Sequence, residues 1–202
     1  FYYTIANGNL IYASEIKAIL AHPDVRKEVN PIALENYLTF QYSVLEETFF
    51  KGIFKLMPAH CFTFKDGKMD IKRYWEPVFE ADRSKSLEEY VDEIDAAMQD
   101  SIKAHKVADV EVGSFLSSGV DSSYVAAWFY GDKTFTVGFD YEKYNEIDYA
   151  KALSEKIKID NYSKLISKKE YWDSIPTVQY HMDEPLADAS AIALYFVTKT
   201  AS

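Results

Sequence analysis

The sequence predicts an α+β part over residues 1–75 and an α/β part with a parallel, doubly wound sheet over residues 87–202. Short apolar runs joined by Asn-Gly or Asp-Gly occupy the first part, a pattern typical of antiparallel hairpins. In the second part strands alternate regularly with helices, which favours a parallel sheet. The polar stretch over residues 76–86 is typical of a linker.

The composition predicts a globular protein with a core of its own. Of its 202 residues, 48% are hydrophobic and 27% are charged, which excludes a disordered chain. The formal net charge of -10 repels phosphate backbones, so we expect no nucleic-acid partner. No apolar run reaches the length of a membrane span, so no membrane is expected. The single cysteine, Cys61, excludes an internal disulfide and favours a reducing, cytoplasmic setting.

Two hairpins and two helices are expected in the first part. Asn7-Gly8 and Asp66-Gly67 are the strongest hairpin signals in the chain. Ser14 and Asn30 are the expected N-caps of the helices, the second with Pro31 in its first turn. The predicted strands cover residues 2–5, 10–13, 61–64 and 69–71, and the predicted helices cover residues 14–21 and 31–40.

A long helix with a capping box opens the second part. Ser86 precedes Glu89 by three residues, the spacing at which each side chain bonds the other's backbone amide. We expect its apolar face in the core, formed by Leu87, Val91, Ile94, Met98 and Ile102. The predicted strands cover residues 110–116, 134–139 and 162–166, and the helices cover residues 86–104, 122–130, 146–157, 168–181 (disturbed by Pro176) and those from 190 onward.

The seven residues 117–123, with the sequence SSGVDSS, lie where the first of these strands passes into a helix. Ligands of parallel sheets bind beyond the carboxyl ends of the strands. The backbone amides of a tight turn and the helix dipole attract an anion there. Ser117, Ser122 and Ser123 can donate hydroxyl hydrogen bonds, and Gly119 allows a close approach. The turn therefore predicts a polyphosphate site.

Asp121 is the expected magnesium ligand of this site, because Mg²⁺ prefers carboxylate and phosphate oxygens. The turn lacks the lysine of a Walker A loop, so cleavage of the α–β bond of ATP is favoured over transfer of the γ-phosphate. An ordinary helix capped by Ser or Asp is the alternative interpretation of the same residues.

Residues 117–122 resemble the S-G-G-x-D-S loop of the N-type ATP pyrophosphatases, with Ser118 in place of the usual glycine. A serine fits there if its φ angle stays negative. The resemblance implies the sheet of that superfamily. It also implies that Ser117, Ser118, Gly119, Ser122 and Ser123 hold the pyrophosphate together with Asp121.

Motifs along nearly the whole chain, in the same order, are similar to those of the glutamine-dependent asparagine synthetase family. The resemblance implies that residues 1–75 are the end of an Ntn-type glutaminase domain. The matching segments are residues 13–18 (ASEIKA), 49–53 (FFKGI), 56–60 (LMPAH), 74–75 (YW), 134–139 (TFTVGF), 145–150 (NEIDYA) and 183–185 (DEP) followed by Asp188. Met57 and Ala59 depart from the family's L-P-P-G-H.

This family likeness implies a carbon–nitrogen ligase. ATP would adenylate the β-carboxylate of aspartate and release pyrophosphate, and ammonia from glutamine would then displace AMP. Leu116 and Val137 would line the adenosine pocket, and the parent protein would be a homo-oligomer. Asp183, Glu184 and Asp188 would bind Mg²⁺ or position the substrate amine, and a solvated acidic loop is the alternative.

The family's glutaminase cysteine and its S-G-E-G-x-D-E motif, which carries the catalytic glutamate, are expected upstream and downstream of this sequence. We therefore expect an internal piece of a longer protein that is inactive alone, with no catalytic residue of its own. His60 and Cys61 are neighbours in a strand and point to opposite faces, so a structural role is expected. A plain surface helix is expected around Glu15 and Lys17.

Two alternatives remain open. The first is another enzyme with a pyrophosphate loop, such as a β-lactam synthetase, a GMP or NAD synthetase, or a tRNA-modifying enzyme. The second is a non-catalytic nucleotide-binding protein on the same fold. The flanking coding sequence would separate them, since a tyrosine in place of the expected downstream glutamate favours the β-lactam relative.

Overall fold

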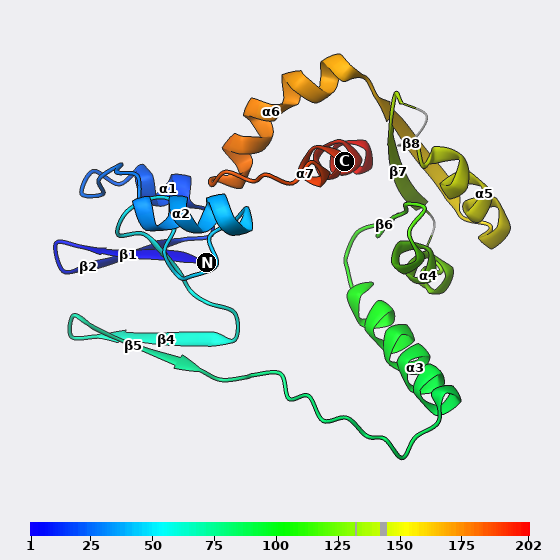
Figure 1. Cartoon of the computed structure of the whole chain (residues 1–202), viewed down its shortest axis with the longest axis horizontal. Helices are drawn as coiled ribbons and strands as arrows, with labels where there is room; N and C mark the ends of the chain where they lie inside the picture. The colour runs from blue at the N-terminus through cyan, green and yellow to red at the C-terminus, as the bar shows by residue number, and fades with distance from the viewer. Residues whose placement is uncertain (132, 142–144) are drawn as a thin grey trace. The chain divides into compact units, whose positions relative to one another are not determined.

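The computed structural model describes residues 1–131, 133–141 and 145–202, which form two compact units (Figure 1). Unit 1 contains Phe1–Glu80 and Pro176–Asp188, and unit 2 contains Ala81–Ile175 and Ala189–Ser202. The chain passes from unit 2 to unit 1 at Pro176, which lies inside helix α6 (Lys168–Met182).

A three-stranded antiparallel sheet forms the first half of unit 1. Its strands β1 (Tyr2–Ala6), β2 (Asn9–Ala13) and β3 (Phe54–Lys55) have the order β2-β1-β3. Asn7 and Gly8 connect β1 and β2 with φ angles of 51° and 80°, the left-handed values that such a hairpin turn requires. The first predicted hairpin is confirmed.

The second predicted hairpin is also confirmed. Strands β4 (His60–Lys65) and β5 (Lys68–Arg73) pair antiparallel through Asp66 and Gly67, whose φ angles are 51° and 72°. The Phe62 ring lies 5.6 Å from the ring of Phe1 and 6.1 Å from that of Tyr3, so β4 packs against β1 through aromatic contacts.

The two helices of unit 1 begin differently. Helix α2 (Pro31–Phe40) has the predicted cap, since the Ile32 amide donates to Asn30 Oδ1 at 3.1 Å. For α1 (Ile16–Leu20) the predicted N-cap Ser14 is wrong. Glu15 holds that position and forms no side-chain cap, because a carboxylate distant in sequence takes the first amide of the helix. The unit's core is built around Ile16, Ile19 and Ile53.

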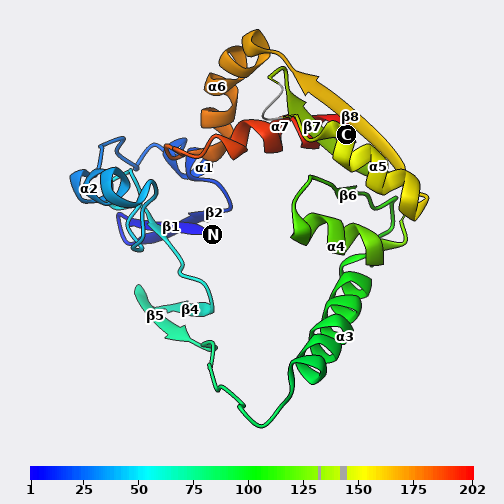
Figure 2. The ribbon, with the colours of Figure 1, turned by 45° about the vertical axis from the view of Figure 1, so that its right-hand side comes forward.

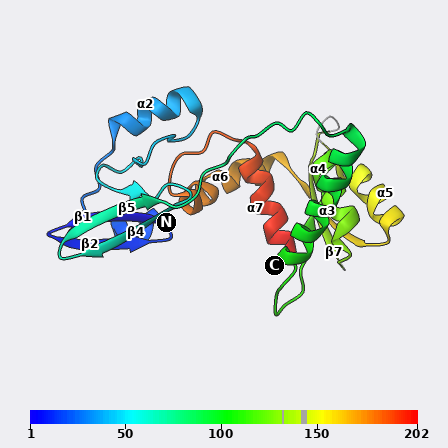
Figure 3. The same cartoon turned by 90° about the horizontal axis from the view of Figure 1, so that it is seen from below.

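Unit 2 contains the predicted parallel sheet. Strands β6 (Ser114–Phe115), β7 (Lys133–Phe139) and β8 (Asp160–Ile166) are parallel and have the order β6-β7-β8. Helices α5 (Ile147–Ile157) and α7 (Ser190–Ala201) contact β7 and β8 from opposite faces (Figures 1 and 3). Burial on both faces explains why β7 is almost continuously apolar or small.

The first strand of this sheet is shorter than the predicted residues 110–116. Only Ser114 and Phe115 pair with β7, and Ser114 is already level with Thr134, the second residue of that strand, so residues 110–112 have no β7 residue opposite them. Val110 is accordingly 77% exposed. Helix α4 (Val120–Phe129) follows β6, and Leu116, Ala126 and Ala150 form a buried cluster between β6, α4 and α5.

Helix α3 (Leu87–His105) has the predicted capping box. The Ser86 amide donates to Glu89 Oε2 at 2.7 Å, and the Glu89 amide donates to Ser86 Oγ at 3.2 Å. The predicted burial of its apolar face is wrong for most of the helix. Leu87, Val91 and Ile94 are exposed and Met98 is partly exposed, whereas Ile102 is buried where α3 meets α4.

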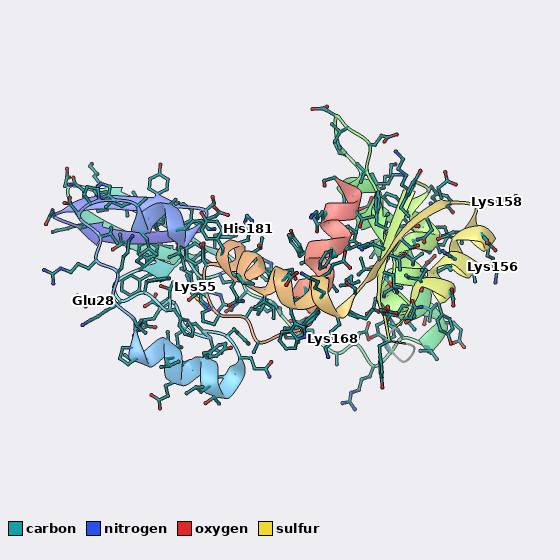
Figure 4. The ribbon with its side chains drawn as sticks, turned by 90° about the horizontal axis from the view of Figure 1, so that it is seen from above. Glu28, Lys55, Lys156, Lys158, Lys168 and His181 are labelled. Carbon is teal, nitrogen blue, oxygen red and sulfur yellow. The ribbon has the colours of Figure 1, made fainter. Side chains whose placement is uncertain are left out.

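Helix α5 lies along β8 (Figure 2) and ends in basic residues. Lys158 is its C-cap with a φ angle of 60°, and Lys156 stands in its last turn (Figure 4). Positive side chains are favoured at this end by the helix dipole. Within the described part of the chain, no helix combines the length and the apolar character that crossing a membrane requires.

Candidate anion-binding site

Residues 117–123 lie at the carboxyl end of β6 and run into α4, as the strand–turn–helix interpretation predicted. The oxygens of the Ser117 and Ser122 hydroxyls lie 2.8 Å apart. Ser122 Oγ also accepts the Ser117 amide at 3.2 Å, and Ser117 Oγ accepts the Gly119 amide at 3.1 Å. These bonds fix the turn and leave the first amides of the helix without an acceptor.

The amino end of α4 is left open toward an acceptor. Its N-cap is Gly119, and no side chain caps it, so the alternative of a Ser or Asp cap is wrong. The amides of Val120, Asp121 and Ser122 have no acceptor among the described residues, whereas the Ser123 amide bonds Gly119 O at 3.1 Å. Ser123 Oγ donates to the same carbonyl at 2.8 Å. Three free amides at a ten-residue helix can bind an anion.

Ser118 meets the condition under which a serine can replace the usual glycine, namely a φ angle that is not positive. It is absent from the residues of positive φ, so a side chain at this position causes no backbone strain. Gly119 has a φ angle of -69°, so a glycine is not needed there for its backbone angle, and its role is to let a ligand approach the backbone closely. A Cβ atom there would lie 3.2 Å from Ser117 Oγ, the oxygen that accepts the Gly119 amide.

Glu146 is a member of the site that sequence reasoning missed. Its Oε2 accepts the Ser118 amide at 3.2 Å, although the two residues lie 28 positions apart. Glu146 is the N-cap residue of α5, which places it beside the turn. The Asn145-Glu146 pair noted in the family likeness was the only signal in the sequence that could have identified it.

Asp121 stands in the first turn of α4 with its side chain exposed. Its carboxylate has no hydrogen bond or ion pair with any described residue. No group of three potential metal ligands occurs in the described ranges 1–131, 133–141 and 145–202. A free carboxylate beside an anion site fits Mg²⁺, which is commonly held by one or two carboxylates plus phosphate oxygens.

Leu116 directly follows the end of β6, as predicted, whereas Val137 lies within β7, two residues before the end of that strand. The Leu116 amide donates to Phe135 O at 2.9 Å, and the Leu116 carbonyl accepts the hydroxyl of Thr136 at 2.8 Å. The Leu116 side chain is 3% exposed and packs on Ala126. Val137 is half-buried and stands one residue further along β7, level with the start of the turn.

The acidic segment belongs to unit 1, whereas the turn belongs to unit 2. Asp183 Oδ2 accepts the Ile16 amide at 2.7 Å, and Glu184 Oε1 accepts the Phe49 amide at 2.7 Å. Asp188 is exposed. Lys17 is not the plain surface residue that was expected, because its Nζ lies 2.9 Å from Asp183 Oδ1 and its side chain is 22% exposed.

His60 and Cys61 follow the predicted alternation. His60 is partly buried and its Nδ1 lies 2.8 Å from Pro58 O, while the free thiol of Cys61 is exposed. The structure therefore supports a structural role for His60 and shows no thiol–imidazole pair here.

Two family models match the chain. Residues 93–202 match the asparagine synthase model, and residues 1–75 match the glutamine amidotransferase domain. The chain belongs to the asparagine synthase family. The first match contains the 117–123 turn and the whole parallel sheet, and the second contains both hairpins of unit 1.

Three relatives agree with this assignment. The chain is 39% identical over 206 residues to "Asparagine synthetase [glutamine-hydrolyzing] 1" of Bacillus subtilis, covering 99% of the chain and 32% of that protein. A putative asparagine synthetase of Mycobacterium tuberculosis is 34% identical, covering 96% and 31%. A second putative one, from Methanocaldococcus jannaschii, is 30% identical, covering 100% and 41%. The chain spans about a third of the length of most of the curated relatives it matches.

Proposed function

We propose that this chain is part of a glutamine-dependent asparagine synthetase. The observation that carries the proposal is the open anion-binding turn between β6 and α4, in a chain whose two ends match an amidotransferase and an asparagine synthase. The parent protein would use ATP, aspartate and glutamine and would release asparagine, AMP, pyrophosphate and glutamate.

The turn would grip the β,γ-pyrophosphate of ATP. The free amides of Val120, Asp121 and Ser122 would donate hydrogen bonds to the phosphates, and the positive end of the helix dipole would attract their charge. The Ser117–Ser122 contact keeps the turn closed around them. The exposed residue Ser118 and the Ser123 hydroxyl would complete the binding surface, and Gly119 keeps it shallow.

Asp121 would hold Mg²⁺ against these phosphates. When bound, the ion neutralises charge that develops on the leaving pyrophosphate. The protein's own part is to present an unpaired carboxylate at the mouth of the turn, where bonding to neighbouring side chains does not compete.

The adenosine would lie beyond β6 and β7, with Val137 as its apolar contact and the buried residue Leu116 as the packed support below. We also propose that the sheet is the doubly wound sheet of the N-type ATP pyrophosphatases. Parallel order, helices on both faces and a ligand turn at a strand's carboxyl end support that fold.

In the reaction, a β-carboxylate oxygen of aspartate attacks the α-phosphorus of ATP and pyrophosphate leaves. Ammonia then attacks the carbonyl carbon of the adenylate and AMP leaves. The ammonia comes from hydrolysis of glutamine in the amidotransferase half. We propose that these steps need residues beyond this chain, which covers 32% of the Bacillus subtilis relative, and that the chain alone is inactive.

Asp188, which is exposed, remains a proposed substrate-side residue. The carboxylates of Asp183 and Glu184 are engaged by backbone amides. The exposed free thiol of Cys61 supports a reducing, cytoplasmic setting, and a homo-oligomeric parent remains part of the proposal.

Oxygen labelling of the full-length protein tests this function. Aspartate carrying ¹⁸O in its β-carboxylate should transfer one labelled oxygen to AMP, because the attacking oxygen stays with the phosphorus. Mass spectrometry of the AMP reads the result. Unlabelled AMP with aspartate, but labelled AMP with another carboxylate, would retain the adenylation chemistry and reject aspartate as substrate.

A further inference from the structure

The segment 176–188 belongs to the asparagine synthase match by sequence and to unit 1 by its contacts. Residues 1–80, which make up the rest of unit 1, contain the whole amidotransferase match. Unit 1 is therefore built from both family regions. The contacts inside it show how a short synthetase-family segment is held on the amidotransferase-family sequence.

Asp183 contacts two backbone amides and one ammonium group of the amidotransferase-family sequence. Its side chain is 6% exposed, and Oδ2 accepts the Ile16 amide at 2.7 Å while Oδ1 accepts the Lys17 amide at 3.3 Å. Lys17 Nζ completes the arrangement at 2.9 Å from Oδ1. The same ammonium lies 5.3 Å from the centre of the Tyr180 ring, so Lys17 contacts the segment at two places.

Glu184 makes a second, independent contact. Its Oε1 accepts the Phe49 amide at 2.7 Å. Burial raises the pKa of Glu184, while the Phe49 amide and the positive charge of Lys55 act in the opposite direction. Lys55 comes from β3 and His181 from the end of α6, both in unit 1 (Figure 4).

A carboxylate leaves water only where other groups compensate the loss. Here two adjacent carboxylates are withdrawn from solvent, and each receives an amide from a different part of the amidotransferase-family sequence. A solvated acidic loop would need neither contact. Asp183 also adopts a φ angle of 63°, a left-handed conformation that is uncommon for non-glycine residues and that its surroundings must hold.

We propose that Asp183 and Glu184 are an intrachain docking clamp that fixes the synthetase-family segment onto the amidotransferase-family sequence and couples ammonia production to ammonia use. The coupling rests on the proposed function, whereas the docking does not. Both are positioning residues, since their carboxylates bind protein groups. Ammonia released in an undocked enzyme would be diluted into solvent before it reached the adenylate.

The docking is tested by hydrogen exchange in the full-length protein. Asp183→Asn should speed exchange of the Ile16 amide by about tenfold or more and should change exchange of the Phe49 amide less. Glu184→Gln should speed exchange of the Phe49 amide and should change that of the Ile16 amide less. Glu15→Gln is the matched control, since Glu15 lies 3.3 Å from Lys17 Nζ but is 53% exposed, and it should change neither amide. Unchanged exchange at Ile16 in Asp183→Asn would overturn the clamp.

The coupling is tested by product ratios in the same variants. With glutamine as nitrogen source, Asp183→Asn should raise the glutamate formed per asparagine by about twofold or more, while asparagine formation from added ammonia stays near wild type. An unchanged ratio with lowered ammonia-dependent activity would overturn the coupling and assign the residue to the synthetase site. If Asp183→Asn does not fold, Lys17→Met removes the ion pair, keeps both amides and should raise the ratio in the same direction.

Failure of the proposed function would look different. A wild-type protein that makes no asparagine from either nitrogen source would reject the synthetase assignment, and the exchange rates at Ile16 and Phe49 would still decide whether the clamp exists.

Discussion

The hydroxyl oxygens of Ser117 and Ser122 lie 2.8 Å apart and close the turn between β6 and α4. Ser122 thereby holds the residue that enters the turn, while its own amide remains free for a ligand. Under the proposed function, the same residue would both shape the site and donate its amide to a bound phosphate.

Removing this hydroxyl should weaken ATP binding more than it affects folding. Ser122→Ala loses the bonds to Ser117, and we expect the affinity for ATP to fall by about five- to tenfold. The free energy of unfolding should change by less than about 1 kcal/mol, because alanine is well suited to a helix. Calorimetric titration and urea unfolding measure the two quantities. Ser101→Ala, an exposed helical serine of α3, is the control and should leave both unchanged.

The unpaired carboxylate of Asp121 predicts a magnesium-specific loss. Asp121→Asn should weaken Mg²⁺-dependent ATP binding by more than about tenfold, since the amide keeps the size of the side chain but loses its charge. Asp148→Asn is the matched control for Asp121→Asn, because Asp148 is also an exposed aspartate in the first turn of its helix. Titrations with and without Mg²⁺ compare the variants, and equal losses in both would remove Asp121 from the metal role.

Replacing Ser118 with the glycine that is usual in such loops should not increase the affinity for ATP. Its φ angle is not positive, so Ser118→Gly relieves no strain and should change ATP affinity by less than about threefold. A large increase in affinity would show that the serine distorts the bound turn.

The start of α6 predicts a defined pH dependence of stability. Glu170 Oε1 lies 2.6 Å from Lys164 Nζ, and Glu170 Oε2 accepts the Ser167 amide at 2.9 Å. The hydrogen bond from Lys164, followed by those from Ser167, lowers the pKa of Glu170 from 4.5 to about 2. A folded-state pKa below the unfolded value stabilises the protein above the unfolded pKa. That stability is lost as the pH falls from 4.5 to about 2.

Urea unfolding of wild type and Glu170→Gln across this pH range checks the sign. The wild type should be more stable by a constant margin at neutral and weakly acidic pH, and the margin should shrink below pH 4.5. A margin that persists unchanged down to about pH 2 would show that the Glu170 charge does not contribute.

Features set by a few neighbouring residues could be predicted from the sequence. The Asn30 cap, the capping box of Ser86 and Glu89 and the turn at Asn7-Gly8 all follow from local hydrogen bonds or backbone angles. The 117–123 turn belongs to the same class, because a strand, a run of small residues and a helix follow one another directly.

Features that depend on distant residues could not be predicted. The group that takes the first amide of α1 is Asp183, 167 positions away from Ile16, and Glu146 reaches Ser118 across 28 positions. Periodicity identified the apolar face of α3 but carries no information on what covers it, and Val91 is exposed in the described structure.

The central claim is that the 117–123 turn grips pyrophosphate while an adenylate of aspartate forms. The most direct measurement is the exchange of labelled pyrophosphate into ATP, catalysed by the full-length protein. We predict exchange that requires both aspartate and Mg²⁺ and that is lost in Asp121→Asn. Absence of exchange with aspartate or with any other carboxylate would contradict the claim and leave a non-catalytic nucleotide-binding protein.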